Sequence, residues 1–332
     1  MMQPDITQPN NYRIDEAKYK SLLKYIRLSV TEKYEFPQEI VQIDDVTIAT
    51  IGNFSASTGK PKSKKTFNVS AIVASALSGK EVLKYKAELP SCKNRILYID
   101  TEQSKCHCHK VLHRILKLAG LPTDQENDNI QFLVLREYTP DQRRDIIRWA
   151  LHEEQNIGLV IIDGIRDLIH DINSPSESLD IINELMRWSS YYELHIHTVL
   201  HLNKGDDNTR GHIGTELNNK AETILQISKN NENGRISEVK AMHIRDREFT
   251  PFAFEIGEDS LPHLVKDHQF KKNKMDRLVS YTDMTEQQHR TALEVAFEEC
   301  AEYGYQSLLE SLKRGYESIG YSRGRNTLVN LC

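Results

Sequence analysis

The feature that most constrains this chain is the segment 59–66, which reads GKPKSKKT. The alternating residues 54–58 before it predict a strand, and the apolar residues 66–77 after it predict a helix that ends near Gly79. A loop of this kind binds phosphate, because its backbone N–H groups and the helix N-terminus point at the anion. The segment therefore predicts a site for a nucleoside triphosphate. The alternative is a lysine-rich surface turn.

Two side chains of this loop carry the predicted chemistry. Lys65 is expected to reach the β and γ phosphate oxygens, and the Thr66 hydroxyl to ligate Mg²⁺. Lys64 takes the place of the second glycine in the pattern G-x-x-x-x-G-K-[ST]. A lysine held at positive φ costs about 1–2 kcal/mol, so we expect the loop to be shaped a little differently. The predicted nucleotide contacts are Gly59, Lys60, Lys62, Ser63, Lys64, Lys65, Thr66 and Phe67.

A second element, the apolar run 157–162, is typical of a buried parallel strand and is followed by Asp163. Open α/β sheets bind ligands at the carboxyl ends of their strands. Asp163 is therefore expected to hold Mg²⁺ through water. The alternative is that Asp163 only caps the turn at Gly164.

A third hydrophobic run, 95–100, is followed closely by Glu102. Here the chain resembles the RecA-like ATPases, in which the strand after the phosphate-loop helix ends in a glutamate that polarises the attacking water. The resemblance implies that Glu102 acts as this general base. The alternative is that Glu102 and Ser104 only start the helix that is predicted over 106–118.

A fourth element follows another predicted strand: HLNK at 201–204, a loop rich in Gly and Asp, and RGHIGTEL at 210–217. It is similar to the corresponding segment of hexameric RepA-type helicases and their relatives on mobile elements. The resemblance implies that His201 reads the γ-phosphate and that the loop from Gly205 to Gly211 lines a central pore. Lys204 and Arg210 are the candidate DNA contacts of this region. The alternative for His201 is an ordinary residue at the end of a strand.

The last element, 239–249, is a strand that runs into a basic turn, with 252–256 as the return strand. RecA-like hexameric helicases place a Lys/Arg pair near this point that reaches the neighbouring subunit's nucleotide. The resemblance makes Arg245 the first candidate for this finger and Arg247 the second. For either arginine alone, a solvent-exposed position in a hairpin is the competing interpretation.

The order of these elements predicts the fold. Periodicity indicates an α/β protein with a mostly parallel sheet and helices on both faces, and the resemblance implies that this sheet is a RecA-like core. Predicted helices lie near 104–119, 140–154 and 177–192, and predicted strands near 96–100, 130–135, 157–162, 195–200 and 223–228. The chain is particularly similar to ATPases of mobile genetic elements in Bacteroidetes-type bacteria, in which a lysine-rich phosphate loop recurs. Lys64 would then be a family trait.

Composition sets outer limits on function. The chain has 332 residues, of which 39% are hydrophobic and 27% charged, and a net charge of −5, so any contact with nucleic acid is expected to be local. No apolar run approaches the roughly 18 residues of a membrane span, and no signal core begins the chain, so we expect a cytoplasmic protein. The five cysteines are expected to be reduced.

The sequence CHCH at 106–109, with His113, suggests a metal cluster at first sight. In a helix Cys106, His109 and His113 share a face, whereas Cys108 points elsewhere. A closed zinc site needs four convergent ligands. We therefore favour a partly buried helix face over a metal site.

Four regions are expected: a helical arm at 1–41, the RecA-like ATPase domain at 42–262, a basic linker at 263–284 and a small helical domain at 285–332. The arm is predicted to contain an amphipathic helix over 13–30, which hooks a neighbouring subunit or packs within its own chain. The C-terminal domain has the outline of a helix-turn-helix, and a helical docking domain is an equal alternative. Its candidate phosphate contacts are Lys313, Arg314, Arg323 and Arg325.

Together these patterns predict a Mg²⁺-dependent ATPase without membrane contact, and the resemblance implies that it acts on single-stranded DNA as a hexameric ring. The favoured role is that of a helicase-like motor for replication or mobilisation of a mobile element. One alternative is a recombinase-like filament ATPase. The other is an ATP-gated adaptor that hydrolyses its nucleotide slowly.

Overall fold

The computed structural model describes residues 15–202, 211–230, 232–266, 268–270, 285–298, 304–319, 321 and 328. The chain divides into two compact units, with the boundary between Val265 and Lys266. The first unit contains all of the predicted ATPase elements. Each unit is described by itself below.

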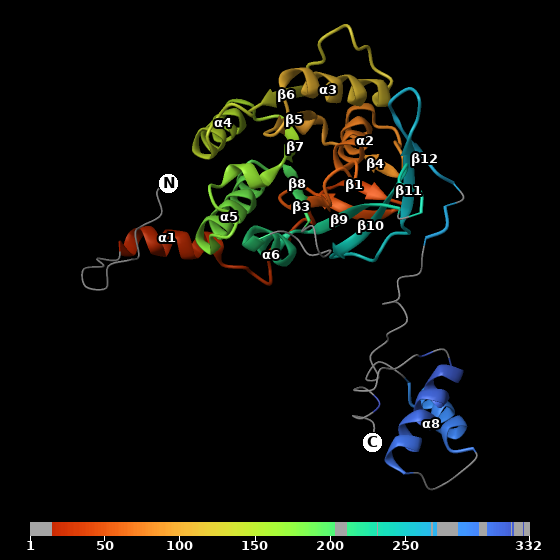
Figure 1. Ribbon diagram of the computed structural model, residues 1–332. Helices are drawn as coiled ribbons and strands as arrows, with labels where there is room; N and C mark the ends of the chain where they lie inside the picture. Colours follow the sequence, from red (N-terminus) through yellow and green to blue (C-terminus); the bar gives the residue numbers. More distant parts are fainter. Residues whose placement is uncertain are drawn as a thin grey trace. The chain divides into compact units, whose positions relative to one another are not determined.

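The first unit is built on a nine-stranded sheet with the order β12-β11-β10-β9-β3-β8-β7-β5-β6 (Figure 1). The strands from β9 to β6 are parallel, and β10, β11 and β12 extend the sheet in antiparallel fashion. The strands are β3 (Phe54–Gly59), β5 (Arg95–Asp100), β6 (Ile130–Val134), β7 (Ile157–Asp163), β8 (His195–His201), β9 (Thr223–Lys229), β10 (Ile236–Ile244), β11 (Phe252–Ile256) and β12 (Pro262–Leu264). The predicted mostly parallel sheet is confirmed.

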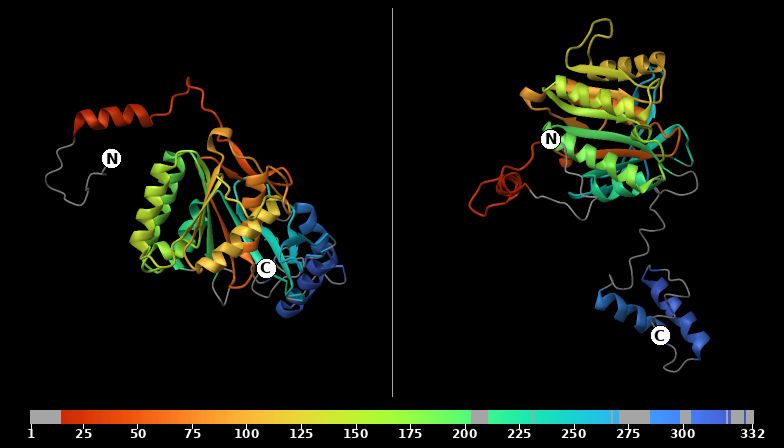
Figure 2. Two further views of the ribbon diagram at one scale, coloured as in Figure 1. Left: turned by 90° about the horizontal axis from the view of Figure 1, so that it is seen from above. Right: turned by 90° about the vertical axis from the view of Figure 1, so that its left-hand side faces the viewer.

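Helices cover both faces of this sheet (Figure 2, left). They are α2 (Lys65–Ser78), α3 (Lys105–Ala119), α4 (Pro140–Glu153), α5 (Pro175–Tyr191) and α6 (Gly211–Lys220). Apolar residues of α2 and α3 share one buried cluster with the sheet, and those of α4, α5 and α6 share another. The predicted helices near 104–119, 140–154 and 177–192 are present as α3, α4 and α5, with bounds that differ by one or two residues.

Local sequence explains where these helices begin and end. Thr139 caps α4 in a reciprocal capping box with Gln142, and Pro140 fills the first helical position, where no N–H is needed. α2 ends at Ser78 and is followed by Gly79, whose left-handed conformation lets its N–H donate a hydrogen bond to the main-chain oxygen of Ser75.

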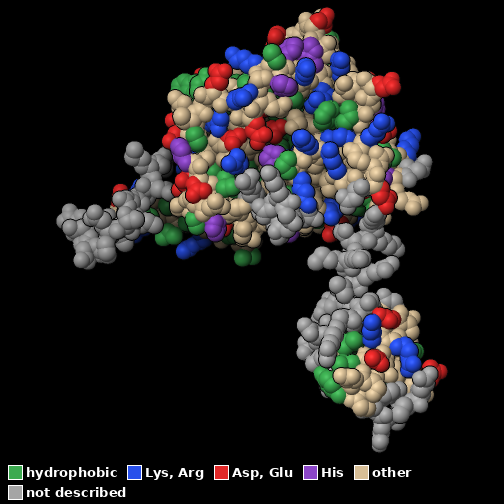
Figure 3. Space-filling view, in the orientation of Figure 1, with side chains coloured by type: hydrophobic (Ala, Val, Ile, Leu, Met, Phe, Trp, Pro, Cys, Tyr) green, Lys and Arg blue, Asp and Glu red, His purple; other side chains and the backbone are tan. Residues whose placement is uncertain are grey.

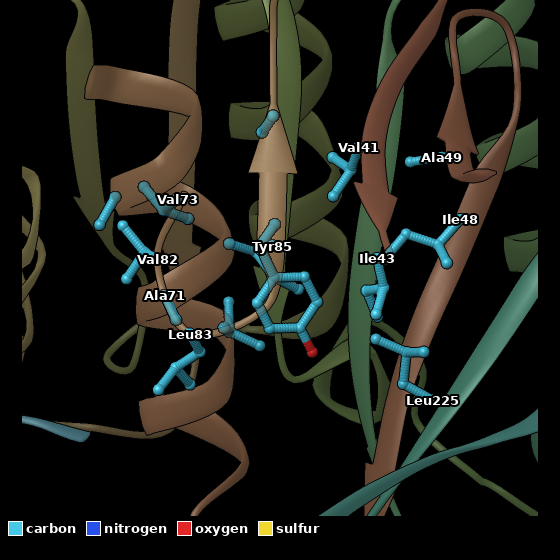
Figure 4. Packing of buried hydrophobic residues seen from close by; sticks show 14 of the residues in the cluster. Val41, Ile43, Ile48, Ala49, Ala71, Val73, Val82, Leu83, Tyr85 and Leu225 are labelled. Carbon is cyan, nitrogen blue, oxygen red and sulfur yellow. The ribbon is translucent and has the colours of Figure 1, made fainter. Parts of the chain in front are cut away.

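A smaller sheet, with the order β2-β1-β4, packs on the α2 side. Its strands are β1 (Glu39–Ile43), β2 (Val46–Thr50) and β4 (Tyr85–Ala87). Figure 4 shows that Ile43, Ile48 and Tyr85 of this small sheet lie in the same core as Leu225 of β9. The Tyr85 hydroxyl donates a hydrogen bond of 2.8 Å to Oδ1 of Asn68, which fixes the small sheet to α2.

The N-terminal helix α1 (Glu16–Ile26) is shorter than the predicted helix over 13–30. Asp15 caps it by accepting a hydrogen bond from Lys18, and Arg27 is already extended. Its apolar side chains Leu22, Leu23 and Ile26 are exposed. Ile14 lies outside the described residues.

In the second unit, α7 (Glu286–Ala296) and α8 (Tyr305–Ser318) pack around a small core. A Cβ on Gly315 would lie 2.2 Å from the carbonyl oxygen of Ala292, so the close approach of the two helices requires glycine. Of the predicted third helix only Leu328 is described, and it joins the core. Arg323, Arg325 and linker residues 271–284 lie outside the described residues.

Candidate active site

Four parallel strands bring the predicted chemistry to one edge of the large sheet. In the register of the strands, Gly59 pairs with His201, Asp163 pairs with Val199, and Asp100 pairs with Asp163. The carboxyl ends of β3, β8, β7 and β5 therefore lie side by side. This is the edge at which open α/β sheets bind ligands.

The phosphate loop joins β3 to α2 at this edge. A Cβ on Gly59 would lie 2.2 Å from the carbonyl oxygen of Ile227 and 2.5 Å from Oγ of Ser63, so only glycine fits there. Lys64 has φ 69° and ψ 32°, the left-handed conformation that favours glycine. The expectation that Lys64 reshapes the loop was wrong at this residue, which keeps the glycine-like conformation.

Contacts with the β9–β10 hairpin explain how Lys64 is tolerated. The Lys64 amine donates a hydrogen bond to the main-chain oxygen of Arg235, and Oγ of Ser237 donates one of 3.2 Å to the main-chain oxygen of Ser63. Burial and then the nearby Lys229 lower the pKa of Lys64. The lysine thus gains a partner that a glycine could not reach.

Lys65 lies at the centre of the loop. Its Nζ donates to the main-chain oxygens of Gly59 (2.9 Å) and Lys60 (3.2 Å) and to Nδ1 of His201 (3.0 Å). Burial lowers the pKa of Lys65 to about 8, although Asp163 and Glu102 act in the opposite direction. The amine is therefore held where phosphate oxygens would replace carbonyl partners.

Asp163 lies beside the first turn of α2. Its Oδ2 accepts hydrogen bonds from Oγ1 of Thr66 (3.0 Å) and from the hydroxyl of Tyr98 (3.2 Å). Burial and then the charge of Asp100 raise the pKa of Asp163 to about 6. A hydroxyl and a carboxylate this close are the oxygen donors that Mg²⁺ takes from a protein when phosphates supply further ligands, so Thr66 and Asp163 fit this ion.

Glu102 follows the end of β5, and its position is fixed by Asp100. Oδ1 of Asp100 accepts from the main-chain N–H groups of Glu102 (3.0 Å) and Gln103 (2.7 Å), and its Oδ2 accepts from Nε2 of Gln103 (2.7 Å). Oε1 of Glu102 lies 3.4 Å from Nε2 of His201, and this hydrogen bond is the main cause that lowers the pKa of Glu102. His201 thus lies between Glu102 and Lys65.

A pocket of about 320 Å³ opens above these groups, and Lys65, Thr66, Glu102, Asp163 and His201 all line it. A second hollow of about 410 Å³ shares Phe67, Lys110 and Arg114 with it. The Arg114 guanidinium lies over the Phe67 ring, 3.6 Å from its centroid. Sequence reasoning missed Lys110 and Arg114. The sequence could have indicated them, because two basic residues four positions apart lie on the same face of the helix that follows Glu102.

Arg245 and Arg247 lie at the opposite edge of the sheet. β10 runs antiparallel to β9, so Ile244 pairs with Thr223 at the start of β9, and the Arg245 N–H donates to the Glu222 carbonyl (3.2 Å). The seven residues of β9 span about 20 Å between the two edges. Both arginines are exposed, and neither lines the pocket of its own chain.

The predicted DNA contacts are not brought together in the described residues. Lys204 and Arg210 lie outside them, as do Arg323 and Arg325, whereas Lys313 and Arg314 are exposed on α8 in the second unit. In Figure 3, acidic and basic side chains are mixed over the visible face of the first unit. The basic side chains therefore do not form one broad basic surface on that face.

The Cys/His segment lies on α3. Cys106 is exposed and Cys108 is buried, and the rings of His109 and His113 lie 4.1 Å apart. Among the residues that the structure describes, no cluster of three or more His, Cys, Asp or Glu side chains is placed to hold a metal ion. Within the same residues, no helix is both long and apolar enough to cross a membrane.

A mostly parallel sheet, a phosphate loop after β3 and carboxylates at the ends of neighbouring strands define a RecA-like P-loop ATPase. The chain belongs to the AAA domain family, whose model matches residues 41–207, half of its length. A solved structure similar to it is that of the RadB recombinase, with 17% identity and a TM-score of 0.46 over 64% of this chain and 91% of that one. Endoribonuclease YbeY of Fusobacterium nucleatum is 27% identical over 116 residues, which cover 32% of this chain and 70% of that protein.

Proposed function

We propose that this protein is a Mg²⁺-dependent ATPase that acts on DNA. The observation that carries the proposal is the convergence of Lys65, Thr66, Asp163, Glu102 and His201 on one pocket. These residues come from four separate strands or their following loops, and together they supply a phosphate-binding cation, oxygen donors for a metal and a carboxylate for proton transfer.

In this proposal the nucleotide enters along the phosphate loop. Lys65 exchanges its carbonyl partners for phosphate oxygens, and Thr66 with Asp163 would hold Mg²⁺. The ion, when bound, neutralises phosphate charge. The second hollow lies directly beside the phosphate pocket, so the nucleoside would lie there against Phe67 and Arg114.

Glu102 would orient the attacking water and accept its proton, because its carboxylate lines the pocket and its lowered pKa keeps it ionised. His201 contacts both Glu102 and Lys65. When a γ-phosphate competes for Lys65, His201 loses a partner at the end of β8. The segment 203–210, which follows β8, would then respond to hydrolysis.

The proposal for DNA rests on the resemblance of residues 201–217 to RepA-type helicases. It also rests on the position of β8, because a segment that leaves β8 begins at the nucleotide edge. Arg245 and Arg247 are too far from their own pocket to act there, which supports a role in a neighbouring subunit. A ring that acts as a helicase-like motor satisfies both features. The recombinase-like filament and the slow adaptor remain the alternatives.

The test is nucleotide binding and hydrolysis with and without single-stranded DNA. Lys65→Ala should abolish nucleotide binding, whereas the matched changes Lys60→Ala and Lys62→Ala, at exposed loop lysines, should weaken it only modestly. Equal effects of all three would make the segment a basic patch and refute the assigned register. Closed rings in electron micrographs support the motor, open filaments on single strands the recombinase, and a monomer with negligible turnover the adaptor.

A further inference from the structure

A tyrosine below the site has no part in the chemistry described so far. Tyr98 lies in β5, two residues before Asp100, and its side chain is fully buried. Its ring stacks on Phe132 of β6, with the centroids 4.4 Å apart and an angle of 10° between the planes. Tyr98 and Phe132 are direct partners in the strand register, so the ring has little freedom to turn away.

Among the described residues, the Tyr98 hydroxyl has one hydrogen-bond partner, Oδ2 of Asp163, at 3.2 Å. Leaving a buried phenol hydroxyl without an acceptor costs about 1–3 kcal/mol, so a rotation of the Asp163 carboxylate away from Tyr98 is disfavoured by about this free energy. Oδ2 also accepts from Thr66, whereas Oδ1 has no hydrogen-bond donor among the described residues. The two hydroxyls thus take one carboxylate oxygen and leave the other unused.

The two hydroxyl donors differ in how far they depend on the metal. Under the proposed function, the Thr66 oxygen would bind Mg²⁺ through a lone pair while its O–H still donates to Oδ2, so the position of this hydroxyl would depend on the ion. The Tyr98 hydroxyl is instead fixed by the protein, because the ring is buried in the sheet and stacked on Phe132. Tyr98 is therefore the donor that orients Asp163 whether or not the ion is bound.

We propose that Tyr98 is a positioning residue of the metal site, which holds Oδ2 of Asp163 so that Oδ1 is presented to Mg²⁺ or to its water. This inference rests on the proposed function. Outer partners of metal-binding carboxylates commonly change metal affinity by about 10–100-fold when they are removed. A loss near the lower limit is expected here, because Asp163 and Thr66 themselves remain.

The test is Tyr98→Phe, which removes only the hydroxyl. Tyr85→Phe is the matched control. Tyr85 is equally buried, and the one acceptor of its hydroxyl among the described residues is also a side chain, Asn68, which does not line the pocket. The affinity of a fluorescent ATP analogue is titrated against Mg²⁺ concentration without turnover, and the thermal unfolding midpoint of each variant is measured. Tyr98→Phe should raise the Mg²⁺ concentration for half-maximal affinity about tenfold, with metal-free affinity unchanged.

The two variants separate positioning from stability. If both lower the unfolding midpoint but only Tyr98→Phe shifts the Mg²⁺ requirement, the role of Tyr98 is supported. Equal Mg²⁺ requirements for the two overturn it. Phe132→Leu, which keeps the hydroxyl and removes the stacked ring, should give a smaller shift in the same direction and serves if Tyr98→Phe does not fold.

A third variant separates this inference from the proposed function. Asp163→Asn should lose most of the Mg²⁺ dependence of nucleotide binding. If it does and Tyr98→Phe matches the control, the role of Tyr98 alone is overturned. If Asp163→Asn keeps the normal Mg²⁺ dependence, the metal site itself is wrong, and the role of Tyr98 is lost with it.

Discussion

Lys64 of the phosphate loop donates a hydrogen bond to the main-chain oxygen of Arg235, which lies in the turn between β9 and β10. The residue that breaks the glycine pattern therefore ties the loop to the neighbouring hairpin. Its backbone meanwhile keeps the left-handed conformation for which the pattern normally uses glycine.

This arrangement predicts different stabilities for two small substitutions at Lys64. Lys64→Ala loses the side-chain contact and keeps a Cβ at positive φ, whereas Lys64→Gly loses the contact and removes the backbone strain. Lys64→Ala should therefore be less stable than Lys64→Gly by about 1 kcal/mol. Urea unfolding of both variants measures the difference. Equal stabilities would mean that the strain at this position is negligible.

Glu102 is proposed to act on water, so its substitution should separate binding from turnover. Glu102→Gln keeps the size of the side chain and loses the basic oxygen, so ATP affinity should be retained while kcat falls by roughly 10²–10⁴. Equilibrium binding and single-turnover hydrolysis measure the two quantities. Normal turnover would remove Glu102 from the mechanism.

Arg245 is proposed to complete the pocket of a neighbour, which predicts complementation. Arg245→Ala protein should be nearly inactive alone while still binding ATP. Lys65→Ala protein should be inactive as well but still offers an intact Arg245. Mixing the two should restore part of the ATPase activity through interfaces that join one intact pocket to one intact Arg245.

The same mixing assay with Arg247→Ala ranks the two arginines. Mass measurement with ATP and single-stranded DNA present shows whether subunits associate at all. A monomer at micromolar concentration, with no recovery on mixing, would argue for the ATP-gated adaptor.

His197, a buried residue of β8 that contacts β3, predicts a pH dependence of stability. His197 accepts or donates hydrogen bonds with Ser55 (2.7 Å) and Ser57 (2.8 Å), and burial lowers its pKa to about 3 from 6.5. The folded state disfavours the protonated ring, so this stability is complete above pH 6.5 and is lost as the pH falls towards 3. The free energy of unfolding should fall by up to about 1.4 kcal/mol per pH unit in this window.

The histidine itself is tested by His197→Gln, which should lower stability at pH 7.5 and flatten the decline below pH 6.5. His152→Gln, at an exposed position on α4, is the control. Chemical unfolding between pH 4 and pH 8 provides the free energies. An unchanged slope in His197→Gln would assign the acid sensitivity to other groups.

Sequence alone was sufficient for the fold class and for the parts of the site that are local in the chain. Gly59, Lys65 and Thr66 lie within eight consecutive residues that join β3 to α2. Short-range contacts along the chain therefore place them, and a local sequence pattern is enough to predict their positions. Asp163 could be placed too, because an apolar run that ends in a carboxylate indicates the end of a buried strand.

Only the tertiary structure decided how residues far apart in the chain meet. The contacts of His201 with Lys65 and Glu102 depend on strand order and register, and so does the bond from Tyr98 to Asp163. The same is true of Arg245, which antiparallel pairing carries to the far edge of the sheet. Periodicity predicts that a segment is a strand, but which strand pairs with it depends on long-range packing that no local pattern encodes.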